Sequence, residues 1–270
     1  MHGNVAVFPF GQPVQKVCQV SKTPKKVFVL GVYASAVHAR WVDEKGKKII
    51  TALAVASEPE IFWRGTNAEE IINQIRVPEG VGKLRPASDN LNGPSGKTLD
   101  ESFFEPLGFK DRSDTWLCDL VPYSCRNPAQ DKALQEKYLP LQKQFQLPDY
   151  NGWTTVPKVL VDDKRINQIM EELTMADPDV IITLGDQPLK WFTSKKFGTK
   201  SRLVDYGEER NTYGRLHDIS SDGWNLKLLP LVHPRQAGRL GSNSSKWAQL
   251  HDYWVESVAP QIGLELTALT

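Results

Sequence analysis

Two polar residues of the sequence stand where a buried strand would end, which is where chemistry is often placed. His233 follows the apolar run 228–232 and precedes Pro234. A proline there holds the preceding residue in an extended conformation and ends the strand. A neutral imidazole fixed at this point donates a hydrogen bond to a developing anion. The alternative is a structural histidine bonded to backbone, and the sequence leaves both open.

Asp119 is the second candidate, because it lies near the end of the apolar run 116–121. A carboxylate there accepts a hydrogen bond from an N–H group of a ligand or activates a water molecule. The structural alternatives are a helix cap or an ion pair with Arg126. The sequence does not decide between them.

Motifs of several other reaction classes are missing. GxxxxGK[ST], GxGxxG, GxSxG and HExxH do not occur, so nucleotide, dinucleotide, serine-hydrolase and zinc-protease sites have no support. The three cysteines, Cys18, Cys118 and Cys125, form no CxxC pair, and the five histidines are dispersed. We therefore expect no metal and no other cofactor.

Composition indicates an ordinary globular protein. The chain has 270 residues, of which 40% are hydrophobic and 24% charged, and its net charge is +1. With no internal repeat and no low-complexity linker, we expect a single domain over residues 1–270 with its core at about 27–258. The N-terminus has no signal-peptide pattern and no apolar run is long enough to cross a bilayer, so we expect a cytoplasmic protein without a membrane partner.

Basic residues are clustered even though the net charge is near zero. One face of a neutral protein can still bind a polyanion if that face carries the charge. The alternative is that these are solvated surface lysines. The clusters are Lys22, Lys25 and Lys26; Lys45, Lys47 and Lys48; Lys195, Lys196, Lys200 and Arg202; and Arg235, Arg239 and Lys246.

The elements that must position His233 and Asp119 alternate between strand and helix. Such alternation predicts a parallel sheet covered on both faces, with its sites at the carboxyl ends of the strands. We expect strands at 27–30, 48–56, 115–121, 180–184, 213–219 and 224–231, the last two antiparallel. We expect helices at 98–107, 161–175, 186–192 and 244–258, and a helix start at 34–41 capped by Ser35. We expect a long loop at 78–96 and an ordered loop at 134–159 that could serve as a lid.

Taken together, these segments resemble the uracil-DNA glycosylase superfamily. Residues 93–109 are similar to the Gly-Pro-Ala/Ser-Gly-x-x-Leu-Asp segment of its bacterial iron–sulfur branch, although the cysteines of that branch are absent. Residues 116–126 resemble the strand that carries the base-reading asparagine, and 180–189 resemble the strand followed by Leu-Gly. Residues 231–234 resemble the final strand with its His-Pro, and 31–35 fall where the first catalytic motif belongs.

The resemblance implies an α/β fold, with three α/β/α layers around a central four-stranded parallel sheet. It implies a monomeric DNA-repair enzyme that flips a damaged or deaminated base out of DNA and hydrolyses its N-glycosidic bond. His233 would stabilise the departing base, Asp119 would contact its Watson–Crick edge, and either His38 or a carboxylate without an assigned position would handle water. The backbone N–H groups of 33–36, at a helix start, would bind base or phosphate. The resemblance places base-binding residues at Gly31, Val32, Tyr33, Ala34, Ser35, Leu91 and Asn92, and DNA-binding residues at Ser95, Lys97, Arg235, Gln236 and Arg239.

This chain departs from the family pattern at the residues that recognise uracil. Val32, Tyr33 and Ala34 stand where the family has a polar residue that positions water, and Leu91 stands where it has a stacking aromatic. Asp119 replaces the base-reading asparagine, so a deaminated purine or a cytosine derivative is a candidate base beside uracil. Two other functions stay open: an inactive nucleic-acid-binding module of this fold, and an enzyme acting on free nucleobases or nucleosides.

Overall fold

The computed structural model describes residues 6–240 and 244–268, which gather in two compact units. The first, here called the antiparallel-sheet unit, consists of the described residues of segments 1–17, 33–94 and 122–158. The second, the parallel-sheet unit, consists of those of segments 18–32, 95–121 and 159–270. Each unit has a sheet of its own. The single domain expected from sequence stays a prediction.

The parallel-sheet unit is built on a five-stranded sheet in the order β5-β1-β6-β8-β7. Strands β5, β1, β6 and β8 run parallel, and β7 joins the edge antiparallel to β8. The predicted four parallel strands are therefore confirmed, and the fifth strand corrects the predicted count. The strands are β1 (Val27–Tyr33), β5 (Thr115–Val121), β6 (Val180–Leu184), β7 (His217–Ser221) and β8 (Trp224–Leu231).

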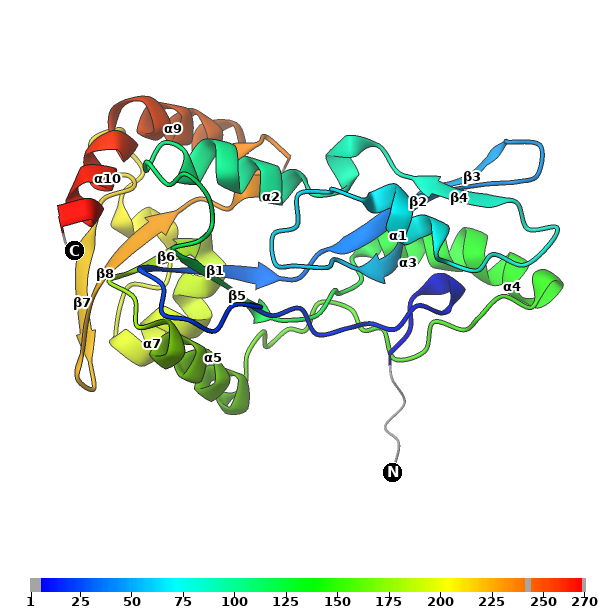
Figure 1. The fold of residues 1–270 in the computed structure, drawn as a ribbon, viewed down its shortest axis with the longest axis horizontal. Helices are drawn as coiled ribbons and strands as arrows, with labels where there is room; N and C mark the ends of the chain where they lie inside the picture. The colour runs from blue at the N-terminus through cyan, green and yellow to red at the C-terminus, as the bar shows by residue number, and fades with distance from the viewer. Residues whose placement is uncertain (1–5, 241–243, 269–270) are drawn as a thin grey trace. The chain divides into compact units, whose positions relative to one another are not determined.

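Helices cover both faces of this sheet, with α9 and α10 on one side and α5 and α7 on the other (Figure 1). This arrangement explains why the inner strands are continuous apolar runs, since both of their faces are buried. All five residues of β6, for example, are buried. The helices and helical turns are α2 (Pro94–Leu99), η3 (Asp100–Phe104), α5 (Asp163–Ala176), α6 (Asp186–Pro188), η5 (Leu189–Thr193), α7 (Ser194–Phe197), η6 (Leu203–Tyr206), α8 (Pro234–Ala237), α9 (Ser244–Ser257) and α10 (Ala259–Ala268).

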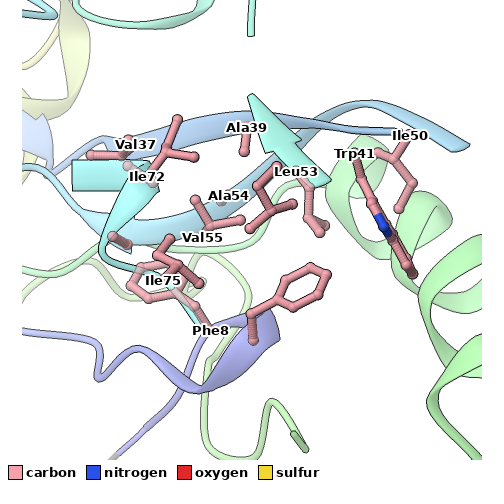
Figure 2. Close-up of a cluster of buried hydrophobic side chains, with 14 of the residues drawn as sticks. Phe8, Val37, Ala39, Trp41, Ile50, Leu53, Ala54, Val55, Ile72 and Ile75 are labelled. Atoms are coloured by element: carbon pink, nitrogen blue, oxygen red, sulfur yellow. The ribbon is translucent and has the colours of Figure 1, made fainter. Parts of the chain in front are cut away.

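The antiparallel-sheet unit has a three-stranded sheet in the order β3-β2-β4. Buried apolar side chains from β2, β3 and α1 pack together with Phe8, and Figure 2 shows this cluster. Trp41 of β2 is fully buried there, and its indole N–H donates to the carbonyl of Val81 at 2.8 Å. The elements are η1 (Pro9–Gly11), β2 (Ala36–Val42), β3 (Lys48–Ser57), α1 (Ala68–Asn73), β4 (Lys83–Pro86), η2 (Asp89–Leu91), α3 (Pro128–Ala133), η4 (Leu134–Tyr138) and α4 (Leu139–Phe145).

The helix start predicted at 34–41 is wrong, because residues Ala36–Val42 form strand β2. Alanines at 34, 36 and 39 favour a helix locally, but β2 pairs with β3 on one side and β4 on the other. Pairing on both sides and burial of Trp41 outweigh that local propensity. Ser35 is therefore not a helix cap, and the proposed anion site at a helix start has no helix.

Two segments predicted as loops contain regular structure. The 78–96 segment includes β4 and η2, and 134–159 includes η4 and α4, while a lid role for 134–159 stays a prediction. Pro128 is the first residue of α3, where a missing N–H costs nothing. The side chain of Asn127 caps α3 by accepting from the N–H of Gln130 at 2.9 Å.

Candidate active site

His233 lies directly beyond the carboxyl end of β8, where it is the N-cap of α8. Its Nδ1 accepts a hydrogen bond from the backbone N–H of Arg235 at 3.1 Å. An accepting Nδ1 carries no proton, so in the neutral ring the proton is on Nε2. The local geometry thus fixes the tautomer that offers an N–H donor away from α8.

Burial lowers the pKa of His233 to about 4, with the nearby charge of Arg235 adding to the effect. The residue keeps part of its surface accessible. The imidazole is therefore neutral at pH 7 and still reachable by a ligand. A neutral donor of this kind can stabilise a developing anion by a hydrogen bond, without transferring its proton to the anion. The structural interpretation of His233 is confirmed, because Nδ1 accepts the N–H of Arg235, and its role as a donor to a ligand stays a prediction.

Gly185, at the carboxyl end of the neighbouring strand β6, fits closely against His233. Its φ of 85° and ψ of −174° lie in a region that is essentially restricted to glycine. A Cβ added there would lie 3.4 Å from the Cβ of His233. The N–H of Gly185 also donates to the carbonyl of Leu231 at 2.7 Å, which ties the ends of β6 and β8 together.

Replacing Gly185 by alanine is expected to lower the free energy of unfolding by about 1–3 kcal/mol through backbone strain. It should also shift the side-chain NMR signals of His233, because the new methyl group crowds its Cβ. Gly223→Ala is the matched control: Gly223 has a φ of 86°, and its Cβ would meet nothing within 4 Å. Urea unfolding and histidine NMR measure both effects. Unchanged His233 signals in Gly185→Ala would contradict the proposed fit.

A buried hydrogen-bonded chain holds the backbone just before His233. The N–H of Val232 donates to the hydroxyl oxygen of Tyr213 at 3.0 Å. That hydroxyl donates to Nδ1 of His251 at 3.0 Å, and Nε2 of His251 donates to the carbonyl of Ser102 at 2.9 Å. Burial lowers the pKa of His251 to about 4, so the ring is neutral and has one donor and one acceptor nitrogen. Every polar group in this series of hydrogen bonds therefore has a partner, which restricts movement at residue 232.

Asp119 lies near the carboxyl end of β5, the strand at the other edge of the sheet. The guanidinium of Arg165 covers this edge: Nη2 donates to the Asp119 carbonyl at 2.6 Å and Nε to the Leu120 carbonyl at 3.1 Å. Its Nη1 pairs with Glu172 at 3.0 Å, and Glu172 also accepts from the indole of Trp116 at 3.1 Å. Arg165 thus caps carbonyls that no further strand can pair.

Asp119 is only 3% exposed, and burial raises the pKa of its carboxyl group to about 7. Arg165 lowers this pKa and Glu172 raises it, but desolvation is the largest cause. Near neutral pH the group is therefore present both as an acid and as a carboxylate. The expected structural partner, Arg126, forms its ion pair with Asp131 at 3.0 Å.

In the antiparallel-sheet unit, the segment after β1 is held by a buried carboxylate. Glu58, which is 5% exposed, accepts the backbone N–H of Ser35 at 2.8 Å. Three residues after Ser35, the backbone of His38 is bonded to the side-chain amide of Asn92. This amide accepts from the His38 N–H at 2.8 Å and donates to the His38 carbonyl at 2.9 Å. Asn92 therefore extends the pairing of β2.

A model of the uracil-DNA glycosylase superfamily matches residues 88–254, more than half of the chain. The chain belongs to the uracil-DNA glycosylase superfamily. The matched residues include β5, β6 and β8, and with them Asp119, Gly185 and His233. A search of curated proteins gave no match.

The residues that the resemblance assigned to this superfamily's site fall into both units. The roles of all of them stay predictions. Arg239 pairs with Asp252 at 2.6 Å, Arg235 donates to the Leu240 carbonyl at 3.0 Å, and Lys97 is exposed. The parallel-sheet unit holds Gly31, Val32, Ser95, Lys97, Asp119, His233, Arg235, Gln236 and Arg239, and the antiparallel-sheet unit holds Tyr33, Ala34, Ser35, His38, Leu91 and Asn92.

Other features of the described residues bear on where ligands bind. A pocket of about 330 Å³ lies at the opposite ends of the strands, beside Val27 and Val180, which begin β1 and β6. It is therefore not the site at the carboxyl ends. Within residues 6–240 and 244–268, no group of three or more His, Cys, Asp or Glu side chains is placed to hold a metal ion. No helix in the same residues is long and apolar enough to span a membrane.

Sequence reasoning missed Glu58, Arg165, Tyr213 and His251. A signal for Glu58 existed, because a carboxylate two residues after the apolar run 52–56 resembles the pattern that singled out Asp119. Arg165 and His251 gave no signal. They lie within helical segments, and only the packing of those helices brings them against β5 and Tyr213.

Proposed function

We propose that this superfamily member is a DNA glycosylase that hydrolyses the N-glycosidic bond of a damaged or deaminated base in base excision repair. The observation that carries the proposal is His233, a neutral imidazole with its Nε2–H free of the helix cap and a pKa of about 4. Hydrolysis makes the base leave as an anion, and a fixed donor stabilises that charge as it develops. The bond is buried in stacked duplex DNA, so the base must be flipped out first.

The spacing of the strands supports a base between Asp119 and His233. Two strands, β1 and β6, separate β5 from β8. Neighbouring strands lie about 4.8 Å apart, so the two backbones are about 14 Å from each other. That span accommodates a planar base with one side chain reaching it from either side.

Asp119 supports recognition of the edge that deamination creates. Deamination converts a ring nitrogen and amino group into a ring N–H beside a carbonyl. A protonated carboxyl group donates to that carbonyl and accepts from that N–H, as an asparagine amide does, whereas a carboxylate only accepts. Because the pKa of Asp119 is about 7, the protonated form is well populated at neutral pH. Uracil, hypoxanthine and xanthine all present this edge. A carboxyl group pairs with cytosine as well, so cytosine belongs in the test.

The direct test of the proposal uses oligonucleotides that carry one uracil, hypoxanthine, xanthine, cytosine or mismatched thymine, in single and double strands. Cleavage of abasic sites after incubation reports base release. Release of uracil, hypoxanthine, xanthine or mismatched thymine, and of no base from a fully paired oligonucleotide that lacks them, is the expected result. Release from no substrate at any pH between 5 and 8 would overturn the proposal.

A second candidate function is a DNA-binding module that has lost catalysis. The observation that favours it is the apolar first motif at Val32, Tyr33 and Ala34. Salt-sensitive binding to DNA without release of any base selects this function over the enzyme.

A further inference from the structure

A basic surface with a tryptophan at its centre lies on the helix that follows β6. We call it the Trp191 patch, and it consists of Lys190, Trp191, Lys195, Lys196, Lys200 and Arg202. Lys190, Lys195, Lys200 and Arg202 are exposed, whereas Trp191 and Lys196 are partly exposed.

Contacts along the helix order the centre of the patch. Gln187, Trp191 and Lys195 are four residues apart, so they lie on one side of the helix. The Trp191 indole N–H donates to the side-chain oxygen of Gln187 at 3.0 Å. The Nζ of Lys195 lies 4.8 Å from the indole centroid, and the Nζ of Lys190 lies 5.4 Å from it. One indole therefore gathers two ammonium groups by cation–π contacts.

The segment of the patch carries more positive than negative charge, although Asp186 and Asp205 flank it. Residues 187–204 include five lysines and arginines and no aspartate or glutamate. As far as the structure describes the chain, the one ion pair of the patch joins Arg202 to Asp205 at 3.9 Å. Two ammonium groups at one indole repel each other, and an anion bound between them lowers that repulsion. This concentration of charge stands out in a protein whose net charge is +1.

The helix that carries the patch begins directly after a residue of the candidate active site. Helix α6 begins at Asp186, directly after Gly185, whose backbone fits against His233. Gln187 is the next residue, and Trp191 and Lys195 follow at one-turn intervals. The helix thus carries the basic surface away from the catalytic histidine.

We infer that the Trp191 patch binds the phosphodiester backbone of the DNA strand that flanks the target base. The inference rests on the proposed function, since it takes DNA as the ligand. Lysine ammonium groups contact phosphates as point charges and carry no sequence information. The patch therefore adds affinity and positions the strand without selecting the base.

The test compares two double variants by the salt dependence of DNA binding. Lys190→Gln with Lys195→Gln removes the two ammonium groups at the indole. Lys45→Gln with Lys47→Gln removes two exposed lysines of the β2–β3 turn and is the matched control. Fluorescence anisotropy with a labelled 20-base-pair duplex gives the binding constant from 50 to 200 mM NaCl. Release of the base from the same duplex is measured on each protein.

Each lost phosphate contact makes the slope of log Kobs against log salt less steep by about 0.9. We expect a change of about 1.8 for the patch variant and none for the control. Equal slopes in all three proteins, or equal changes in both variants, would overturn the inference. If the proteins release base and the slopes are equal, the patch inference fails while the proposed function stands. If the unaltered protein neither binds DNA nor releases base, both fail.

Discussion

Replacing His233 by alanine is expected to slow base release by about 100- to 1000-fold, the loss seen when one preorganised donor to a developing anion is removed. The donor is Nε2–H, because Nδ1 accepts the N–H of Arg235. Alanine removes this donor, so the departing base anion has no hydrogen bond from residue 233. Binding of DNA should change little, because the interaction forms only as charge develops on the base. Single-turnover rates and anisotropy measure the two quantities separately.

His217→Ala is the control for this variant. His217 is a partly exposed histidine of β7 and lies outside the proposed site. Urea unfolding of both variants shows whether the fold is kept, since alanine at 233 also removes the side-chain cap of α8. An unchanged rate of base release in His233→Ala would exclude this residue as the electrostatic catalyst.

The pH profile provides an independent check on His233. Its pKa is about 4, so the ring stays neutral from pH 5.5 to 8. We expect no step in the rate near pH 6.5 that depends on His233. A step at that pH that is absent in a His233 variant would show that the ring works as an imidazolium, against our proposal.

Replacing Asp119 by asparagine is expected to stabilise the protein at pH 8 and to have almost no effect at pH 4. Burial raises the pKa of the folded state from 3.8 to about 7. Between those values the folded protein holds a proton that the unfolded chain lacks. The free energy of unfolding therefore falls as pH rises, by about 1.4 kcal/mol per pH unit. Asparagine does not titrate, so its advantage grows to about 4 kcal/mol above pH 7.

Urea unfolding at pH 4, 5, 6, 7 and 8 measures this difference for Asp119→Asn. Asp222→Asn is the control, because Asp222 is exposed in the turn between β7 and β8. Its difference from the unaltered protein should stay constant over the same range. A constant difference for Asp119→Asn would contradict a buried carboxyl group that ionises near pH 7.

The same variant tests how the base is read. The carboxyl group matches the N–H and carbonyl edge of uracil only while it is protonated. Release of uracil by the unaltered protein should therefore rise as pH falls through 7. In Asp119→Asn this step should disappear, since the amide offers a donor and an acceptor at every pH. A step that persists in the variant would assign it to another group.

The sequence determined the sheet of the parallel-sheet unit and the place of its candidate residues. Buried parallel strands are short continuous apolar runs, and such runs at 115–121, 180–184 and 224–231 became β5, β6 and β8. Pro234 placed His233 directly after a strand. Parallel topology then brings the strand ends to one edge, so Asp119 and His233 followed from pattern and chain order alone.

The antiparallel-sheet unit was less predictable, because its elements depend on partners distant in sequence. The alanines of 34–41 favour a helix, yet the segment is a strand between β3 and β4. The 134–159 segment was expected to be a loop, yet it includes η4 and α4. Local propensity is small beside the free energy gained when a segment pairs and buries its side chains.

The chemistry of the site was decided by tertiary structure. The sequence contains His233 and Asp119, but the tautomer of one and the pKa of each depend on neighbours and burial. Arg165 and Glu172 reach Asp119 from helix α5, more than 40 residues away. Hydrogen bonds and desolvation act over a few ångströms in space, whatever the distance along the chain. The sequence thus identifies the candidate groups, and only the folded chain sets their charge and direction.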